Sequence, residues 1–317
     1  MRVLVMGGSG FLGSHLCDVL IARGDEVVCV DNLCTGNEAN VAHLRGSPRF
    51  RFVSADVTDH FDFTEPLDAV ADLACPASPP DYQRLPLETL AAGSHGTENG
   101  LRVARRHGAR FVLASTSEVY GDPEIHPQTE DYWGHVNPIG PRSMYDEGKR
   151  YAEAVASTYR RTLGTDVGIV RIFNTYGPRM RPDDGRVVST FLTQALSGTP
   201  LTVHGDGSQT RSFCYVDDLV AGLVAMLDSA EPGPVNLGNP NERTVAELAQ
   251  LVLDVTGSAS PIRYAPLPVD DPVRRRPVVD RARDRLGWAP RVPLDDGLRR
   301  TADWFRSRVP VPAAPRS

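Results

Sequence analysis

The first half of the chain alternates short apolar runs with segments whose apolar residues recur at helical spacing. Six runs have the length and composition of buried β-strands: Arg2–Met6, Glu26–Val30, Phe50–Ser54, Ala69–Ala74, Arg110–Ala114 and Val167–Phe173. Three segments between them have the spacing or the length of helices: Phe11–Arg23, Leu85–His107 and Met144–Leu163. Such an alternation predicts an α/β fold, a Rossmann-type doubly wound parallel sheet covered by helices on both faces.

The pattern changes after Thr175, where glycine and proline interrupt the chain at short intervals. Helical runs follow at Val187–Leu196, Val216–Leu227, Val245–Val255 and Leu294–Arg308. We therefore expect residues 1–176 and 213–238 to form a nucleotide-binding Rossmann domain. Residues 177–212 and 239–309 are expected to form a smaller, interleaved C-terminal lobe that binds substrate. The proline-containing segment 310–317 is expected to be a flexible tail.

The composition excludes several classes of protein. Hydrophobic residues make up 41% of the 317 residues, which is enough for a sizeable core and too many for a disordered chain. A net charge of −6 argues against a nucleic-acid partner, and no apolar run reaches the about 18 residues that cross a membrane. The five cysteines are scattered without a Cys-x-x-Cys motif, so we expect neither a disulfide framework nor a metal site. The sequence opens without a secretion signal, which favours a reducing, cytoplasmic location.

A glycine-rich turn, Gly7-Gly8-Ser9-Gly10-Phe11-Leu12-Gly13, follows the first strand and opens a helix. Glycines allow the backbone to approach a pyrophosphate, whose charge would meet the helix N-terminus. Asp31 lies 21 residues beyond Gly10, at the end of the second strand, where a carboxylate binds ribose hydroxyls and repels a 2′-phosphate. The pattern predicts an NAD site rather than an NADP site, with a plain glycine turn as the alternative. Asp56 and Val57 are placed to contact adenine, unless Asp56 is an ordinary strand-end acid.

Tyr145 and Lys149 lie four residues apart, so they share one face of the predicted helix. Lys149 is the only lysine among the 34 basic residues of the chain. A cation beside a phenol, whose ordinary pKa is about 10, favours the phenolate and makes it a usable base near neutral pH. The alternative is a surface pair without a chemical role.

The predicted fifth strand ends close to Thr116, Ser117 and Glu118. Ligands of a doubly wound sheet collect beyond the carboxyl ends of its strands, so these side chains are expected in the same cleft as Tyr145. A hydroxyl there can hold the substrate oxygen that Tyr145 deprotonates. For Glu118, a solvated loop acid is the alternative.

Several stretches of the sequence resemble the extended short-chain dehydrogenase/reductase superfamily, whose members act on nucleotide sugars, and within it the UDP-glucuronate decarboxylases. The stretches include GGSGFLG, LACPASPP, STSEVYGDP, YDEGK, RIFNTYGPRM and DGRVVS, and the likeness runs from Arg2 to about Arg306. At the position of Glu118, the 4-epimerases of UDP-glucuronate usually carry a small hydroxyl residue. The chain departs from the family at Gly93, where an asparagine is usual, at Asp72, where a histidine is usual, and at His204, where an aromatic ring is more usual.

The resemblance implies roles for three groups of residues. Tyr145 would be the catalytic base, Lys149 its partner and Thr116 the hydroxyl donor, and the remaining catalytic residues would be Ser117, Glu118 and Arg275. The cofactor would contact Gly7, Gly10, Phe11, Leu12, Gly13, Asp31, Asn32, Thr35, Gly36, Asp56, Val57, Leu73, Ala74, Tyr145 and Lys149. The substrate would contact Ser78, Asn174, Arg186, Val188, His204, Arg211 and Arg275.

The reaction implied is the NAD-dependent conversion of UDP-glucuronate into UDP-xylose through a UDP-4-keto sugar that loses CO₂. Release of some UDP-4-keto-xylose and the division of roles between Glu118 and Arg275 stay open. A UDP-glucuronate 4-epimerase is the first alternative, and it would have to turn the keto acid before CO₂ is lost. A non-enzymatic NAD-binding regulator generally loses the tyrosine or the lysine, and Asp31 argues against an NADPH reductase.

A homodimer is also expected, because in the resembling family the two long helices pair across a two-fold axis. The apolar residues assigned to this pairing are Leu87, Leu90, Leu101, Val103, Ala152, Val155, Ala156 and Tyr159. The alternative is that these side chains are buried within the monomer.

Overall fold

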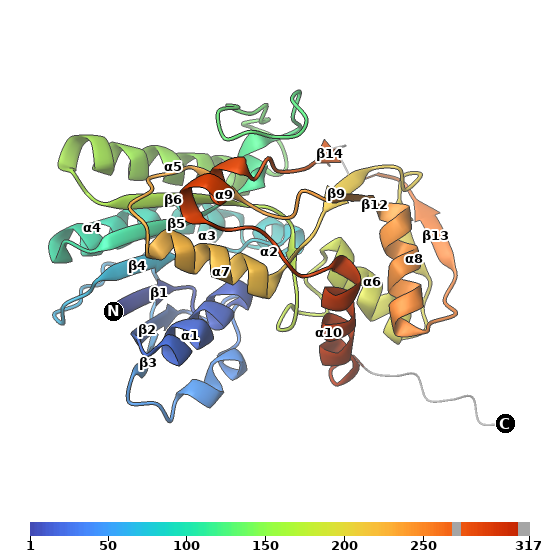
Figure 1. The fold of residues 1–317 in the computed structure, drawn as a ribbon, viewed down its shortest axis with the longest axis horizontal. Helices are drawn as coiled ribbons and strands as arrows, with labels where there is room; N and C mark the ends of the chain where they lie inside the picture. Colours follow the sequence, from blue (N-terminus) through green and yellow to red (C-terminus); the bar gives the residue numbers. More distant parts are fainter. Residues whose placement is uncertain (268–273, 310–317) are drawn as a thin grey trace.

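The computed structural model describes residues 1–267 and 274–309, and within them a seven-stranded parallel sheet forms the centre of the molecule (Figure 1). The strand order is β11-β6-β5-β4-β1-β2-β3. The strands are β1 (Arg2–Met6), β2 (Glu26–Asp31), β3 (Phe50–Ser54), β4 (Ala69–Asp72), β5 (Arg110–Thr116), β6 (Val167–Ile172) and β11 (Val235–Leu237). The order reverses between β1 and β4, which places a ligand crevice at the carboxyl ends of these two strands. The predicted Rossmann-type fold is confirmed.

Helices cover both faces of this sheet because the side chains of each strand alternate between two cores. Val3 and Val5 of β1 pack in the core that includes α1 (Phe11–Arg23) and α7 (Val216–Leu227). Leu4 and Met6 point to the opposite core, which includes α4 (Thr97–His107) and α5 (Ser143–Leu163). Figure 1 shows α1 and α7 on one side of the sheet, and α4 and α5 on the other.

The predicted helix Leu85–His107 is confirmed as one continuous helix over residues 86–107. It comprises α3 (Pro86–Ala91), the π-helical turn η3 (Ala92–Gly96) and α4, and a separate short helix, α2 (Pro79–Arg84), precedes it. Pro86 separates α2 from α3, because proline at the first position of a helix lacks the N–H that would continue the preceding one. The predicted bounds of β1, α1, β3, α7 and α6 (Val187–Leu196) coincide with those observed.

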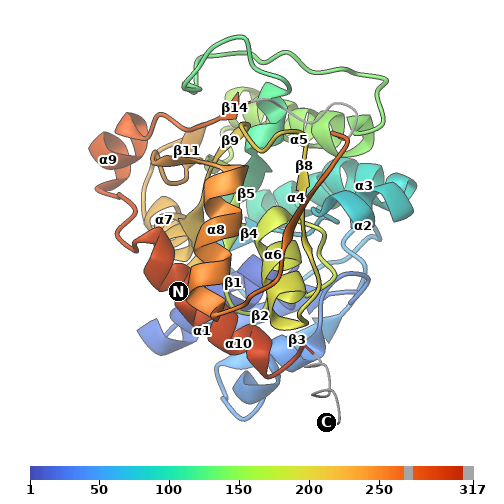
Figure 2. The ribbon, with the colours of Figure 1, turned by 90° about the vertical axis from the view of Figure 1, so that its right-hand side faces the viewer.

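A smaller lobe follows the sheet. Its helices are α6, α8 (Val245–Thr256), α9 (Asp280–Leu286) and α10 (Leu294–Arg306). Its strands are β7 (Thr175–Tyr176), β8 (Leu201–His204), β9 (Thr210–Ser212), β10 (Cys214–Tyr215), β12 (Glu242–Thr244), β13 (Ile262–Ala265) and β14 (Arg274–Arg275). Figure 2 shows α6, α8 and α10 side by side, and their apolar residues join the core of α1 and α7. The expected domain boundaries stay a prediction, and the expected tail 310–317 lies outside the described residues.

Strand β14 matters for the site because it brings a distant segment of the lobe next to β9. The two strands run parallel, and Arg275 lies opposite Arg211. Short helical turns complete the described structure: η1 (Glu38–Asn40), η2 (Ala42–Leu44) and η4 (Ser117–Tyr120). In the part of the chain that the structure describes, every helix is too short or too polar to cross a membrane.

The residues assigned to helix pairing in a dimer are only partly available. Leu101, Val103, Ala152 and Ala156 are buried inside the monomer, because they fill the core beneath α4 and α5. Val155 and Tyr159 pack partly against the same core. Leu87 and Leu90 of α3 remain exposed, at 76% and 40%, and Tyr151 of α5 is exposed at 45%. Fewer apolar side chains on these helices are therefore exposed, and so available for contact with a second copy, than was predicted.

Candidate functional site

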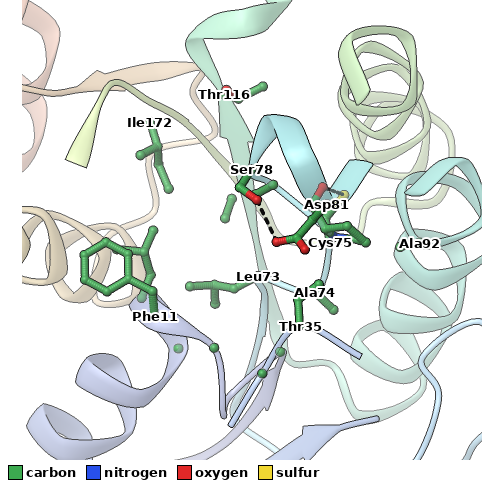
Figure 3. A pocket seen from close by; sticks show the side chains of 18 of the residues that line it. Phe11, Thr35, Leu73, Ala74, Cys75, Ser78, Asp81, Ala92, Thr116 and Ile172 are labelled. Atoms are coloured by element: carbon green, nitrogen blue, oxygen red, sulfur yellow. Dashed lines mark hydrogen bonds between the residues drawn. The ribbon is translucent and has the colours of Figure 1, made fainter. Parts of the chain in front are cut away.

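A cavity opens at the carboxyl ends of β1, β2, β4, β5 and β6, where the sheet topology predicts a ligand site. Figure 3 shows Leu73 near its centre, with Phe11 on one side, and Cys75 and Asp81 on the other. The cavity is also lined by most of the residues assigned from the sequence: Gly7, Gly10, Leu12, Gly13, Asp31, Asn32, Thr35, Gly36, Asp56, Val57, Ala74, Ser78, Thr116, Ser117, Glu118, Tyr145, Lys149, Asn174 and Arg186. One cavity thus joins the predicted cofactor residues with most of the predicted catalytic and substrate residues. Four predicted residues are not among the described residues that line it: Arg275, Val188, His204 and Arg211.

The glycine turn between β1 and α1 has a conformation that only glycine fits. Gly7 has a φ of +74°, and a Cβ atom at Gly13 would lie 2.2 Å from the carbonyl oxygen of Gly7. Gly10 caps α1 without a side-chain hydrogen bond, so the first N–H groups of the helix are left for a ligand at the cavity wall. These N–H groups and the helix dipole suit a pyrophosphate, as in a bound dinucleotide.

Asp31 ends β2 with its carboxylate fixed by backbone N–H groups. The amides of Ser9 and Leu33 donate to it at 2.9 and 2.8 Å. Burial raises its pKa, and these two hydrogen bonds oppose the rise. A Cβ atom at Gly36 would lie 2.8 Å from the carboxylate, so the loop after β2 closes tightly around it. A carboxylate held in this way fits a ribose with free hydroxyls better than a ribose with a 2′-phosphate.

Tyr145 and Lys149 are buried on one face of α5, with exposed fractions of 7% and 4%. The Lys149 ammonium donates a hydrogen bond of 2.9 Å to the carbonyl of Ala114 in β5. The Thr116 hydroxyl lies near enough to the Tyr145 phenol to lower its pKa, and the Tyr145 ring stacks on Tyr82 with centroids 5.3 Å apart. The tyrosine, the lysine and the threonine thus meet at the end of β5.

Burial raises the pKa of Tyr145 above its ordinary value, while the Thr116 hydroxyl and the charge of Arg186 oppose the rise. From the sequence we expected a nearby cation to favour the phenolate. In the described structure the Lys149 ammonium donates to the β5 backbone, and the loss of water around the phenol has a larger effect on the pKa of Tyr145 than any nearby charge. The side chains of this cavity alone therefore keep Tyr145 protonated.

Glu118 lies between two arginines, in the turn that follows β5. Arg275 donates to both of its carboxylate oxygens, with Nη2 lying 2.8 Å from Oε2. The Nη2 atom of Arg142 donates to the same Oε2 at 2.6 Å. Burial alone would raise the pKa of Glu118, but the charges of Arg275 and Arg142 lower it to about 2. Glu118 is therefore ionised at neutral pH and is not a solvated loop acid.

Arg142 was not assigned a role from the sequence. It lies 24 residues from Glu118, in a loop with no helical or strand spacing to relate the two. Arginine is so frequent in this chain that a single arginine carries little information. The one local signal for Arg142 was its place three residues before Tyr145, at the N-cap of α5.

The substrate residues fall into three groups. Ser78, Asn174 and Arg186 line the cavity, and Arg211 lies beside Arg275 on paired strands. His204 is on the exposed end of β8, where its ring bonds the carbonyl of Pro266. Val188 is buried in the apolar core and is not among the described residues that line the cavity. Contact of these residues with a substrate stays a prediction.

Two of the three departures from the family pattern have structural explanations. Gly93 lies in η3, where a Cβ atom would come within 2.9 Å of the carbonyl oxygen of Gly148 in α5, so an asparagine does not fit at this helix contact. Asp72 is buried and accepts a hydrogen bond of 2.9 Å from the Thr97 hydroxyl. Burial raises the pKa of Asp72, and the charge of Lys149 opposes the rise.

Comparisons with known proteins agree with this geometry. The model of the NAD dependent epimerase/dehydratase family matches residues 3–238. UDP-glucuronic acid decarboxylase 1 of Arabidopsis thaliana is 52% identical over 309 residues, which cover 98% of this chain and 71% of that protein. The structure of UDP-glucose 4-epimerase from Thermotoga maritima with UDP-glucose has a TM-score of 0.89 at 30% identity, covering 97% of this chain and 99% of that one. UDP-glucose 4-epimerase of Thermus thermophilus in complex with NAD has a TM-score of 0.85 at 31% identity, covering 98% and 100%.

Proposed function

We propose, from the premise that the chain belongs to the NAD dependent epimerase/dehydratase family, that it decarboxylates UDP-glucuronate to UDP-xylose through a 4-keto intermediate. The family expected from the sequence is confirmed. The 52% identity to a UDP-glucuronic acid decarboxylase extends over nearly the whole chain, whereas the two epimerases of known structure share 30% and 31%. Decarboxylation is therefore favoured over 4-epimerisation.

One observation carries the proposal. The cavity that contains Tyr145 also contains an ionised Glu118, and two guanidinium groups grip that carboxylate. Arginine binds carboxylates through paired hydrogen bonds. Arg275 and Arg142 are not among the described residues that line the cavity, so they support the proposal by holding an ionised Glu118 beside the groups assigned to the sugar hydroxyl.

The cofactor fits the described residues. The turn Gly7–Gly13 would hold the pyrophosphate, Asp31 the adenosine ribose, and Lys149 the second ribose. NAD, when bound, supplies the hydride acceptor at C4 of the sugar and then returns the hydride, so that it is unchanged over a turnover.

Tyr145 has to be a phenolate to act as a base, and the positive charge of the oxidised nicotinamide, when bound, would favour that form. The phenolate would then accept the proton of the C4 hydroxyl, with Thr116 holding the oxygen. Once C4 is a ketone, the C5 carboxylate is β to it. The bond between C5 and the carboxyl carbon then breaks, its electron pair forms an enolate with the ketone, and CO₂ leaves.

Arg275 and Arg142 hold Glu118 ionised at this end of the cavity, and its negative charge disfavours that of the substrate carboxylate and so favours departure as neutral CO₂. C5 then takes a proton from water, because the ionised Glu118 has none to give. Tyr145 returns the proton that it accepted to the C4 oxygen.

The test is to incubate the protein with UDP-glucuronate and NAD, to measure released CO₂, and to identify the nucleotide sugar by mass spectrometry and NMR. We expect CO₂ and UDP-xylose in equal amounts. A shortfall of UDP-xylose, matched by UDP-4-keto-xylose, would identify the keto sugar as a second product. UDP-galacturonate without CO₂ would identify a 4-epimerase instead, and NAD binding without any turnover would favour the regulator.

We also propose that two copies of the chain pair through an α3–α5 face, defined here as Leu87, Leu90 and Tyr151. All three side chains are exposed in the monomer, and burial of apolar area is the main driving force of stable dimers. A reducing compartment such as the cytoplasm is supported by the five cysteines, all of which are free thiols.

A further inference from the structure

Asp81 is a buried acid of the cavity wall for which the mechanism above has no use. It lies in the first turn of α2, its exposed fraction is 5%, and it lines the cavity. The Ser78 hydroxyl donates to its Oδ2 atom at 2.6 Å, as the dashed line in Figure 3 shows. Burial alone would raise the pKa of this carboxyl group, but hydrogen bonds from Ser78, Arg181 and Arg84 lower it. Asp81 is therefore ionised at neutral pH.

The cation that pairs with Asp81 inside the cavity is Arg181, from the loop between β7 and α6. Its Nη2 atom donates to the same Oδ2 atom of Asp81 at 2.6 Å. Its Nη1 atom donates to the carbonyl oxygen of Thr35 at 3.5 Å, in the loop that closes around Asp31. All three residues joined in this way line the cavity. One guanidinium group thus connects α2 with the loop after β2.

Residues 178–186, called here the strap, are also fixed to the protein on either side of this contact. Arg179 donates through Nη2 to the Asp18 carboxylate of α1 at 2.6 Å. Arg186 donates through Nη2 to the carbonyl oxygen of Ala77, in the loop before α2, at 2.9 Å. Both arginines line the cavity. The strap is therefore tied to α1 near one end and to the α2 side of the cavity at the other.

We propose that the Asp81–Arg181 ion pair is a clasp that holds the strap against α2 and keeps the cofactor in the cavity until its hydride has been returned. The pair lines the same cavity as the residues assigned to the cofactor. Opening it would leave the buried carboxylate with fewer partners, which is costly and so slows release. Asp81 is a positioning residue, because it acts through Arg181. The inference deepens the proposed function, since only a reaction that returns its hydride needs a retained cofactor.

Loss of the clasp has a defined chemical consequence. If the cofactor leaves after C4 has been oxidised and CO₂ lost, the hydride leaves with it as NADH. The sugar then keeps its ketone and is released as UDP-4-keto-xylose. NADH and UDP-4-keto-xylose would therefore appear in equal amounts, at the expense of UDP-xylose.

The test begins with Asp81→Asn, which keeps the shape of the side chain and removes its charge. The NAD-loaded enzyme is mixed with excess unlabelled NAD, and the release of labelled NAD is followed. The rate of release should rise on the order of tenfold, the effect of weakening one hydrogen bond to a charged group. With UDP-glucuronate, the variant should release more NADH and UDP-4-keto-xylose than the wild type. Arg181→Gln should act alike, and the double variant should add nothing further, because both changes remove one contact.

The matched control is Asp183→Asn. Asp183 pairs with Nε of the same Arg181 at 3.4 Å, but it lies on the strap itself and its side chain is 84% exposed, so its loss should leave the release rate unchanged. Asp81→Glu, which retains the charge, should release NAD more slowly than Asp81→Asn. An unchanged rate in Asp81→Asn, additive effects in the double variant, or an equal rise in Asp183→Asn would overturn the inference. If the wild type released no CO₂, the proposed function would fail separately, and the rate of NAD release would still decide on the clasp.

Discussion

At the scale of single residues, Glu118 separates the two nearest functions. Glu118→Ala removes the carboxylate that Arg275 and Arg142 hold, and with it the charge that favours departure of CO₂. We expect CO₂ release to slow by a factor on the order of 10²–10⁴, the usual effect of a positioned acid or base. Oxidation at C4 should suffer less, so absorbance of the reduced nicotinamide should build up in a single turnover. Labelled CO₂ and this absorbance are measured on the same sample. Unchanged CO₂ release would show that Glu118 has no part in decarboxylation.

We expect Asp31 to determine the choice of cofactor at the same scale. Asp31→Asn removes the negative charge and keeps an acceptor oxygen for only one of the amides of Ser9 and Leu33, because these donate to different oxygens of Asp31. NAD should bind more weakly, and the preference for NAD over NADP should shrink, because repulsion of the 2′-phosphate disappears. Dissociation constants for both cofactors, measured by calorimetry, provide the check. Equal affinity of the wild type for NAD and NADP would contradict this assignment.

Single positions also show which site residues could be located from the sequence. The glycine turn, Asp31, Tyr145 and Lys149 follow predicted strands or share a predicted helix face, so local spacing placed them correctly around one cavity. Arg142 was missed because its partner Glu118 is brought to it by the loop before α5, and no spacing rule describes such a loop.

At the scale of elements, the π-helical turn η3 depends on Gly93. An added Cβ atom would come within 2.9 Å of the Gly148 carbonyl oxygen, so Gly93→Ala should force η3 and α5 apart. Overpacking of this kind costs about 1–3 kcal/mol, and the better helix propensity of alanine offsets up to about 1 kcal/mol. We expect a net loss of about 1–2 kcal/mol in the free energy of unfolding, measured by denaturant titration.

The matched control lies on the other side of the same contact. A Cβ atom at Gly148 would have its nearest neighbour at 3.8 Å, which is ordinary contact distance. Gly148→Ala should therefore leave stability unchanged or slightly raised. Equal effects of the two substitutions would show that the close approach at Gly93 is not what limits the spacing of these helices.

This element also marks a limit of sequence reasoning. Apolar spacing runs from Leu85 to His107 without a strong interruption, which predicts one helix. The observed helix is continuous, but its π-helical turn η3 was not predicted, because apolar spacing does not distinguish such a turn from an α-helical one. Six of the seven strands of the central sheet were predicted, because most of them are short apolar runs buried on both faces. Strand β11 has only three residues and was missed, and β3 at the other edge is partly exposed.

At the scale of the whole molecule, the α3–α5 face should hold two copies together. Leu87→Glu places a charge at its most exposed leucine, 76% exposed in the monomer, and should convert dimer into monomer at micromolar concentration. Light scattering coupled to size-exclusion chromatography measures the mass. Tyr264→Glu, at a similarly exposed aromatic residue of β13 in the smaller lobe, should leave the mass unchanged. A monomeric wild type would refute the dimer.

The burial of Lys149 has a consequence for the chemical handling of this protein. Lys149 is the only lysine in the chain, it is 4% exposed, and it lines the cavity. Amine-acylating reagents therefore find no accessible side-chain amine on the outer surface of the folded protein. Apart from the α-amino group of Met1, which is 32% exposed, Lys149 is the only amine that such a reagent can modify. The rate at which Lys149 itself is acylated therefore reports how often the cavity admits a small molecule, and a ligand bound there should protect it.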